Sequence, residues 1–333
     1  YSGIVTRLKI MASLDISERR LPQDGRIRIL VGSKELDIRI STLPTIFGEK
    51  IVMRILDRET VLLGMEQLGF EPEELKIFQD ALMKPYGMII VTGPTGSGKT
   101  TTLYAGLSYI NSPDINIITI EDPVEYAISG INQVQVKPKI GLTFPAVLRT
   151  LLRQDPDVIM VGEIRDLETA QIAVQASLTG HLVISTLHTN DTVSSITRLS
   201  YMGVEPYLLA DSLNLVLAQR LVRKICPNCK EEDPEAEEFL KKHGLSLDKN
   251  VILYRGRGCG DCDNTGYHGR VAIYEILNVS RALRKMIVEN VSDDEIRELA
   301  KQHGLVTLRE AAIKKAIAGI TTIREALSST LSL

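Results

Sequence analysis

The residues with the clearest chemical signature form a glycine-rich stretch in the first third of the chain. Residues 93–100 read Gly-Pro-Thr-Gly-Ser-Gly-Lys-Thr, the spacing of a phosphate-binding loop. The glycines let backbone N–H groups point at an anion, and a following helix adds the positive end of its dipole. Lys99 would reach the β- and γ-phosphates of ATP, and Thr100 would hold Mg²⁺. The predicted nucleotide-binding residues are Gly93, Pro94, Thr95, Gly96, Ser97, Gly98, Lys99, Thr100 and Thr101.

Carboxylates follow two predicted strands downstream of this loop. Glu121 and Glu125 bound a short acidic turn after residues 117–120, and Glu163 follows the apolar run 158–161 like the acid of a Walker B strand. Hydrolysis of ATP needs a metal shell and a positioned water, and carboxylates can serve both. We therefore predict catalytic roles for all three, although an acidic turn can also be a plain solvated loop. The pattern leaves open whether Glu163 acts as the general base or holds a Mg²⁺-bound water.

Histidine and arginine supply the remaining candidates. His188 follows the predicted strand at residues 181–187, on the same sheet edge as the phosphate loop, and we predict that it senses a γ-phosphate. His181, before that strand, fits a structural role equally well. Phosphoryl transfer also favours cationic groups near the phosphates. Arg39 and Arg54 would provide them only if their small domain folds over the nucleotide or reaches it from a neighbouring subunit.

Four cysteines predict a second, separate site. They form two C-x-x-C pairs, and 29 residues lie between the pairs. Two such pairs can close a tetrahedral thiolate cage, which is typical of structural Zn²⁺. Reduced thiols are expected in a cytosolic chain, so metal binding is favoured over disulfides, with free thiols or a redox pair as the alternatives. The predicted metal ligands are Cys226, Cys229, Cys259 and Cys262.

The elements that must position these residues alternate between strands and helices from residue 73 onward. Strands are predicted at 88–91, 115–120, 158–161 and 181–187, and helices at 73–83, 143–152 and 167–178. This alternation predicts an α/β fold with a parallel sheet between helices, whose ligands bind at the carboxyl ends of the strands. The loop, the acids and His188 all fall at such ends.

Smaller regions flank this domain. Strand-like segments at 26–31, 35–40 and 50–56, with a turn at Gly32-Ser33, predict a small α+β domain. We expect a charged helical hairpin at 230–245, a helix after Asp293-Asp294, and another that Thr307 and Glu310 start as a capping box. The predicted division is a truncated α+β domain (1–56), a linker (57–72), the ATPase domain (73–225), a zinc subdomain (226–270) and a helical C-terminal domain (271–333).

The amino-acid composition argues against some classes of function for this chain. The 333 residues carry a net charge of −3, 5% aromatics and no Trp, so no nucleic-acid partner is expected. No apolar run approaches the length of about 20 residues that a membrane span needs. The first residue is Tyr1 rather than Met, from which we expect a fragment. A nucleic-acid-directed ATPase with a zinc finger and a non-hydrolysing, nucleotide-gated scaffold remain the alternatives.

Five motifs in order along the chain resemble those of the assembly ATPases of bacterial type II secretion systems and type IV pili. Residues 93–100 resemble the family's Walker A motif, 118–126 its acidic box, and 152–157 with 163–166 its Walker B region. Residues 179–191 resemble its histidine box, and 21–26 resemble part of its second N-terminal domain.

The resemblance implies a homo-hexameric motor with a RecA-like domain preceded by a PAS-like domain. ATP would bind between these domains, and the arginines corresponding to Arg39 and Arg54 would reach the phosphates. The family acts in the cytoplasm, at the periphery of the inner membrane. Its partners are an inner-membrane platform protein and cytoplasmic domains of the secretion or pilus complex. A tetracysteine zinc insertion favours fibre assembly over retraction, but the motifs do not separate type II secretion from pilus assembly.

Overall fold

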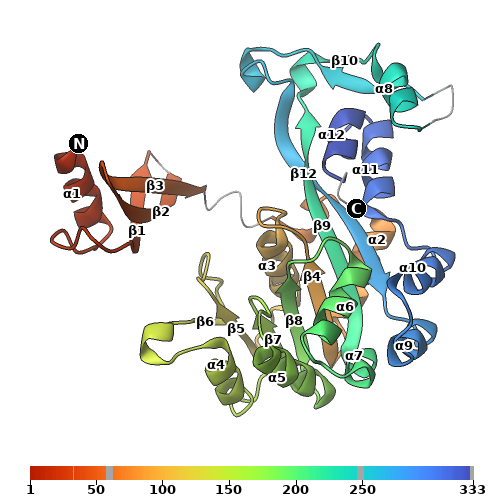
Figure 1. The fold of residues 1–333 in the computed structure, drawn as a ribbon, viewed down its shortest axis with the longest axis horizontal. Coiled ribbons are helices and arrows are strands. Elements are labelled where there is room, and N and C mark those ends of the chain that lie inside the picture. The colour runs from red at the N-terminus through yellow and green to blue at the C-terminus, as the bar shows by residue number, and fades with distance from the viewer. Residues whose placement is uncertain (33, 58–62, 246–250, 331–333) are drawn as a thin grey trace. The chain divides into compact units, whose positions relative to one another are not determined.

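The chain folds into two compact units, Tyr1–Leu63 and Gly64–Leu333. Both are drawn in Figure 1, coloured from red at the N-terminus to blue at the C-terminus. The computed structural model describes the backbone of residues 1–32, 34–57, 63–245 and 251–330.

The division between the units falls inside the range 57–72, which the sequence predicts as a linker. Residues 58–62 of this range lie outside the described residues. Asp57 and Leu63 belong to the first unit. Residues 64–72 belong to the second, where Met65 and Leu68 are buried and a helix starts at Pro72.

The first unit is a helix on a three-stranded antiparallel sheet, as the small α+β pattern predicts. The strands extend beyond their predicted bounds, and Ile27, Ile38 and Ile40 pack against Ala12 and the helix in a small core. Gly32 has a φ of 63° and lies in the turn after β1, whereas Ser33 lies outside the described residues. The elements are α1 (Ser2–Met11), β1 (Gln23–Val31), β2 (Lys34–Thr45) and β3 (Gly48–Asp57).

A seven-stranded sheet in the order β12-β9-β4-β8-β7-β5-β6 organises the second unit. Six strands run parallel and β12 pairs antiparallel with β9, so the sheet is mostly parallel. The four predicted strands of the domain are confirmed. The strands are β4 (Gly87–Thr92), β5 (Ile117–Glu121), β6 (Asn132–Gln135), β7 (Val158–Val161), β8 (Leu182–Leu187), β9 (Leu213–Ile225) and β12 (Tyr267–Asn278).

The hydrophobic pattern predicts no strand at β6, β9 or β12, and residues 271–278 fall in the helical domain that it predicts. The first ten residues of β9, 213–222, are apolar apart from three polar positions, a pattern that fits a buried strand and a buried helix alike. β6 is only four residues long. Pairing with β4 and β12 decides that β9 is extended, because a strand between two neighbours has both of its hydrogen-bonding edges satisfied.

The helices connect and cover these strands. The predicted helix at 167–178 has these bounds in the structure, and those at 73–83 and 143–152 are each confirmed within one residue at either end. The helices of the second unit are α2 (Pro72–Leu82), α3 (Lys99–Ile110), α4 (Phe144–Leu151), α5 (Leu167–Leu178), α6 (Thr192–Tyr201), α7 (Pro206–Ser212), α8 (Ala236–Lys242), α9 (Arg281–Val288), α10 (Asp293–Gln302), α11 (Leu308–Ile317) and α12 (Ile323–Ser328). Short 3₁₀ helices are η1 (Met65–Gln67), η2 (Pro138–Ile140), η3 (Pro227–Cys229) and η4 (Gly260–Cys262).

The C-terminal helices share cores with the sheet instead of forming a domain of their own. Leu283 of α9 and Ile296 of α10 pack in the same cluster as the strands and α4–α7. Leu308 of α11 and Ile323 of α12 pack against Val222 of β9 in a second cluster. The predicted separate domain at 271–333 is therefore corrected: its first residues complete the sheet, and its helices cover it.

The segment after the sheet also differs from the prediction of a helical hairpin at 230–245. It contains a strand, β10 (Lys230–Glu232), which pairs with β11 (Tyr254–Gly256), and the single helix α8. At the other predicted helix starts, Thr307 caps α11 in a capping box with Glu310, as expected, whereas α10 is capped by Ser292, so that Asp293 is its first residue.

None of the helices in the described part of the chain has the length and apolar character needed to cross a membrane.

Glu275 of β12 joins three elements of the second unit. Its side chain accepts from the backbone N–H of Thr192 (3.0 Å) and of Leu308 (3.2 Å), the first residues of α6 and α11. The N–H groups of a first helical turn have no partner within the helix, and the helix dipole favours a negative charge there. A carboxylate with only 5% of its residue surface exposed thus completes two helix N-termini at once.

We expect Glu275→Ala to lower the free energy of unfolding of the second unit by about 2–3 kcal/mol, because it leaves buried donors unsatisfied. Thermal denaturation should show this as a fall in Tm, at roughly 2–4 °C per kcal/mol. Glu275→Gln keeps one acceptor oxygen and should lose less. Glu289→Ala removes only an exposed pair with Lys285 and serves as the control. Equal Tm values for Glu275→Ala and the control would contradict this role.

Candidate functional site

The phosphate loop lies between β4 and α3, in the predicted strand–loop–helix arrangement. β4 ends at Thr92, and α3 begins at Lys99 with Gly98 as its cap in the left-handed region. The hydroxyl of Thr92 accepts from the backbone N–H of Thr189 (2.9 Å), which fastens the end of β4 to the segment after β8. The loop therefore starts from a fixed point at the carboxyl edge of the sheet.

Two glycines of the loop are required by their surroundings. Gly93 has a φ of 146°, and a Cβ there would collide with the backbone oxygen of Gln219 and lie 2.6 Å from Ser97 Oγ. Gly98 has a φ of 89°, and a Cβ would lie 2.8 Å from Gln219 Nε2. Both residues combine a backbone conformation that favours glycine with close packing against β9.

Lys99 folds back over the loop. Its ammonium donates to the carbonyl oxygens of Gly93 (2.7 Å) and Pro94 (3.1 Å). Burial lowers the pKa of Lys99 to about 8; Glu163 opposes this change and Arg220 adds to it. A bound anion would favour the charged form of the lysine, because opposite charges at short range stabilise each other.

The loop fits a polyphosphate in a further respect. Ser97 Oγ is buried and has no hydrogen-bond partner among the described residues. A buried hydroxyl without a partner is rare unless a ligand or water completes it. Thr100 is exposed one residue into α3, where its hydroxyl could bind Mg²⁺. The loop residues thus match the chemistry that ATP with Mg²⁺ requires.

Glu163 and His188 meet at the same edge. The side chain of Glu163, 13% exposed, pairs with Arg165 through one oxygen, and its other oxygen lies 3.5 Å from His188 Nε2. Gly162 is held between neighbouring strands: its N–H donates to Ile120 O (2.8 Å), and its carbonyl accepts from Thr186 Oγ1 (2.6 Å). The structure thus brings Glu163 and His188 together, and Glu163 is close enough to Lys99 to influence its charge.

Glu121 points into the protein. It is 4% exposed, and its carboxylate accepts from Tyr104, from Thr119 Oγ1 (2.6 Å) and from Gln133 Nε2 (3.1 Å). Burial and the neighbouring Glu121 raise the pKa of Tyr104 well above its usual value, so the phenol stays protonated and donates. This network fixes the end of β5 against α3.

Glu125 lies four residues further along, in the half-buried segment that follows. Its backbone N–H donates to the hydroxyl of Tyr104 (3.3 Å), so the same tyrosine holds both acidic positions. The ring of Tyr126 packs edge-on against Tyr104, with centroids 4.5 Å apart. The segment that carries Glu125 is therefore tied to the helix that follows the phosphate loop.

His181 lies at the opposite end of β8 from His188. Its Nδ1 is 3.0 Å from the carbonyl oxygen of Ala176, near the end of α5. This contact favours the structural role for His181.

Two residues of β9 belong to this edge and were missed by the sequence analysis. Gln219 accepts from Thr102 Oγ1 (2.8 Å), and Arg220 donates to the carbonyl oxygen of Asn190 (3.1 Å). Both are buried. The signal that could have found them is a pair of adjacent polar residues inside the apolar run 213–222, since buried polar groups in a strand need partners.

Arg39 and Arg54 belong to the first unit. They lie directly opposite each other on β2 and β3, and Arg26 of β1 lies opposite Arg39 on its other side. Directly opposed residues share one face of a sheet, so the three guanidinium groups form a row. Arg26 is thus a third candidate that the sequence analysis did not name.

The four cysteines form a compact cluster. All four sulfur atoms lie within 4.8 Å of one another. The pairs Cys226–Cys259, Cys229–Cys262 and Cys259–Cys262 have Sγ–Sγ distances of 3.8, 3.9 and 3.7 Å. A tetrahedral zinc ion with Zn–S bonds of about 2.3 Å would place its ligands about 3.8 Å apart. The cluster therefore has the dimensions of a four-sulfur metal site.

Backbone donors surround these sulfur atoms. Gly258 donates to Cys229 Sγ (3.3 Å), and Cys259 and Gly266 donate to Cys262 Sγ (3.2 and 3.3 Å). Burial would raise the pKa of Cys262, but hydrogen bonds from the N–H groups of Cys259 and Gly266 and from the side chains of Cys259 and Cys229 together lower it to about 6. Such donors stabilise thiolates and orient them as metal ligands.

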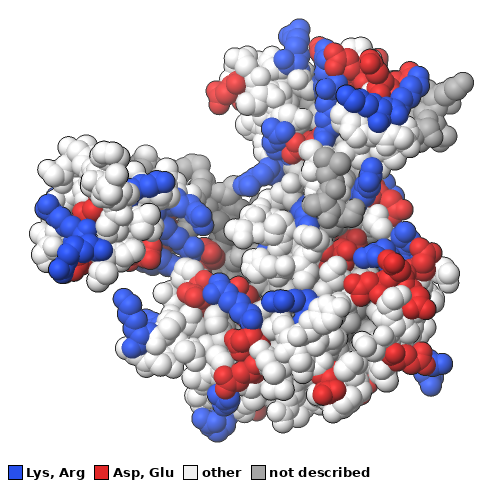
Figure 2. Space-filling view, viewed as in Figure 1, with Lys and Arg blue, Asp and Glu red and all other residues white. Residues whose placement is uncertain are grey.

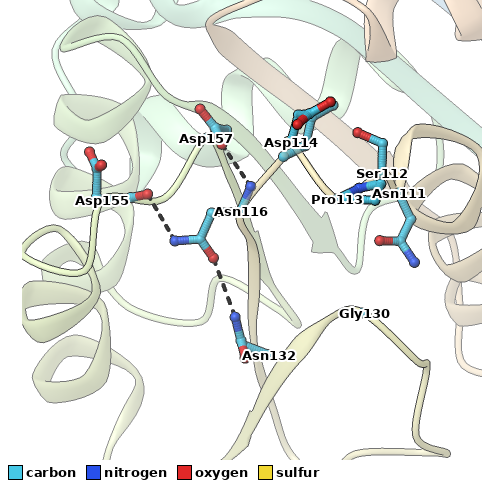
Figure 3. A pocket seen from close by; sticks show the side chains of 10 residues that line it. Asn111, Ser112, Pro113, Asp114, Asn116, Gly130, Asn132, Asp155 and Asp157 are labelled. Carbon is cyan, nitrogen blue, oxygen red and sulfur yellow. Dashed lines mark hydrogen bonds between the residues drawn. The ribbon is translucent and has the colours of Figure 1, made fainter.

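A polar cavity of about 780 Å³ lies away from this chemistry, at the amino ends of β5 and β7. Figure 3 shows Asn116 at its centre, bonded to Asp155, Asp157 and Asn132. The backbone N–H of Asn116 donates to Asp157 Oδ2 (2.7 Å), and its amide donates to the carbonyl oxygen of Asp155 (2.8 Å). These groups fasten the starts of the strands. They are on the opposite edge of the sheet from the phosphate loop, so the cavity is no part of the nucleotide site.

Known proteins with similar sequences span the whole chain. The type IV pilus assembly ATPase PilB of Myxococcus xanthus is 53% identical over 99% of the chain, and the type II secretion system protein E of Xanthomonas campestris is 52% identical over 99%. The chain spans 59% and 58% of these two relatives. Among solved structures, the pilus retraction motor PilT with bound ADP matches 92% of the chain and 77% of its own, with a TM-score of 0.68 and 28% identity.

A family model for type II/IV secretion system proteins matches residues 1–328. This match and the identities above 50% reach from the small unit through the phosphate loop to the C-terminal helices. The chain therefore belongs to the family of type II/IV secretion system proteins.

Proposed function

We propose that this protein is an ATP-hydrolysing motor that powers the assembly of pilin-type fibres, for type IV pilus extension or type II secretion. The observation that carries the proposal is the convergence of Lys99, Glu163 and His188 beside a glycine loop at one sheet edge. Its relatives support it: two are named as an assembly ATPase and a secretion protein, and the similar motor PilT is described with bound ADP.

The roles of the site residues follow from their positions. The loop and Lys99 would hold the phosphates, and Thr100 would hold Mg²⁺, which would offset the negative charge of the phosphates. Glu163 is the group best placed to orient the attacking water, because its carboxylate lies at the end of β7 and near Lys99. His188 adds a hydrogen bond near the γ-phosphate. Glu121 and Tyr104 position the segment of Glu125, which would complete the metal shell.

The arginine row of the first unit would supply further positive charge. We propose that Arg39 and Arg54 reach the phosphates of a nucleotide held by the second unit of the same or a neighbouring copy, with Arg26 beside them. Cationic groups at the transferring phosphoryl can accelerate its hydrolysis by about 10³–10⁵-fold. Such a contribution fits a homo-hexamer in which each copy completes a site.

The partners and location are proposed from the family. A fibre-assembly motor would work in the cytoplasm, at the periphery of the inner membrane, on a platform protein and the cytoplasmic domains of its complex. A nucleic-acid-directed translocase is the alternative. Figure 2 shows Lys and Arg side chains interleaved with Asp and Glu over the visible face of the second unit. This mixture favours protein partners, because nucleic-acid binding relies on concentrated positive charge.

We propose that the four cysteines bind one structural Zn²⁺. The sulfur spacing and the N–H donors fit a closed tetrahedral site, which leaves no coordination position for catalysis. The ion would join the two short turns η3 and η4, which also share a hydrogen bond from Asn228 to Asp261 (2.9 Å). Zinc binding can contribute about 10–16 kcal/mol to the folding of a small metal-binding segment.

Lys99→Ala should abolish measurable ATP hydrolysis while the protein keeps its fold, because it removes the cation that reaches the phosphates. Phosphate release at saturating ATP and Mg²⁺ measures the turnover, and thermal denaturation checks the fold. Lys84→Ala, a change at a lysine outside the site, is the control. Turnover near that of the parent protein would refute the assignment of the phosphate loop.

Arg54→Ala should lower kcat by about 10³-fold or more and change the nucleotide Kd much less. The reason is that the arginine would stabilise charge that develops in the transition state. Steady-state kinetics and binding of a fluorescent ATP analogue separate the two quantities. Arg20→Ala, in the segment between α1 and β1, removes an exposed arginine that pairs with Glu18 and serves as the control. Unchanged kinetics in Arg54→Ala would remove this arginine from the site.

Cys226→Ser combined with Cys229→Ser should release zinc and destabilise residues 226–245 and 251–270, because two of four ligands are lost. Elemental analysis of the purified parent protein should find one zinc per chain, and hydrogen exchange should show faster exchange in those residues in the variant. Parent protein purified without chelator but free of zinc would exclude the proposed metal site.

A further inference from the structure

Two adjacent residues of β9, Gln219 and Arg220, contact the two parts of the candidate site. Gln219 contacts the phosphate loop, and Arg220 contacts the segment after β8. The pairing of β9 with β4 ends at Ala218 opposite Thr92, the last residue before the phosphate loop. Gln219 and Arg220 come next on β9, which extends past the end of β4 and still pairs with β12, so they lie beside the loop. In a parallel sheet this is the edge where ligands bind. The inference below rests on the function proposed above.

Gln219 packs against the loop itself. It is 2% exposed, and its side-chain oxygen accepts from Thr102 Oγ1 (2.8 Å) in the first turn of α3. Its backbone oxygen lies against Gly93 and its amide nitrogen against Gly98, close enough that neither glycine could carry a Cβ. One side chain and its backbone thus touch the start of the loop, its end and the helix that follows.

Arg220 contacts the segment that follows β8, at Asn190. Its guanidinium donates to the backbone oxygen of Asn190 (3.1 Å) and to that residue's side-chain oxygen (3.4 Å), as well as to Gln219 O (3.2 Å). Arg220 is 7% exposed. A buried guanidinium is costly unless its donors are used, so these bonds fix its position. Asn190 is two residues from His188, and the arginine therefore anchors the end of the segment that carries the histidine.

The charges around Arg220 favour this arrangement. Lys99 repels it, and Glu275 and Asp191 attract it. Both acids are engaged elsewhere: Glu275 caps α6 and α11, and Asp191 accepts from Ser194 N (2.7 Å) and pairs with Arg297 (3.1 Å). Arg220 is thus drawn toward two fixed acids at the start of α6. Its position connects the loop lysine with the segment after β8.

We propose that Gln219 and Arg220 are positioning residues with separate tasks. Gln219 holds the loop in the shape that binds the phosphates shared by ADP and ATP. Arg220 holds residues 188–191 in the place where His188 meets the γ-phosphate, which only ATP has. Together they join the two parts of the site that must respond differently to ATP and ADP.

The test compares the affinities of single variants for ADP and for the non-hydrolysable β,γ-imido analogue of ATP, both with Mg²⁺. Gln219→Ala should weaken the binding of both nucleotides by about tenfold and leave their ratio within twofold of the parent value. Arg220→Gln should weaken the ATP analogue at least fivefold more than ADP and lower kcat. Arg220→Lys should shift the ratio in the same direction by less, because it keeps the charge but not the forked donors.

The affinity comparison includes a control variant and a measurement that shows whether each variant is folded. Arg223→Gln removes a half-exposed arginine three positions further along β9, which pairs with Glu325, and should leave both affinities at the parent values. Thermal denaturation without nucleotide reports on each fold. If Arg220→Gln does not fold, the ratio measured for Arg220→Lys decides.

Equal losses for ADP and the ATP analogue in the Arg220 variants would overturn the proposal, because a purely structural role predicts that result. A changed ratio in Gln219→Ala would overturn the separate tasks. If the parent protein binds neither nucleotide, the proposed function fails before this inference is tested.

Discussion

The parallel pairing of β4 with β8 and β9 is the constraint on which the site depends. It places three residues level with one another at one edge: Thr92 before the phosphate loop, Leu187 before His188, and Ala218 before Gln219. A parallel pair fixes which residues end level with each other, because its register cannot slip without moving every side chain to the wrong face. The site is therefore assembled by the register of the sheet before any ligand binds.

Buried polar groups hold this edge in shape. Thr92 bonds to Thr189, Thr186 bonds to Gly162, and Gln219 bonds to Thr102, so each strand end is tied to its neighbour by a side chain. Such bonds in an otherwise apolar interior are costly if one partner is missing. They make the geometry of the loop and of the segment after β8 depend on each other.

Charged side chains also lie near one another at the sheet edge that carries the phosphate loop. Glu163 favours the charged form of Lys99, and Arg220 disfavours it. Glu275 favours the charged form of Arg220. Glu275 in turn completes the N-termini of α6 and α11. The C-terminal helices are thus connected to the phosphate loop through a short series of charged side chains.

The sequence alone determined the local parts of this protein. The spacing of residues 93–100 defined the phosphate loop, the C-x-x-C pairs defined the cysteine cluster, and hydrophobic runs located β4, β5, β7 and β8, because these signals depend only on neighbours along the chain. Tertiary structure decided what long-range pairing controls. It made residues 213–225 and 267–278 strands, turned Glu121 inward onto Tyr104, and placed Gln219 and Arg220 beside a loop more than 100 residues earlier in the chain. No local pattern encodes these outcomes, since each depends on which segments pair and on which buried polar groups find partners.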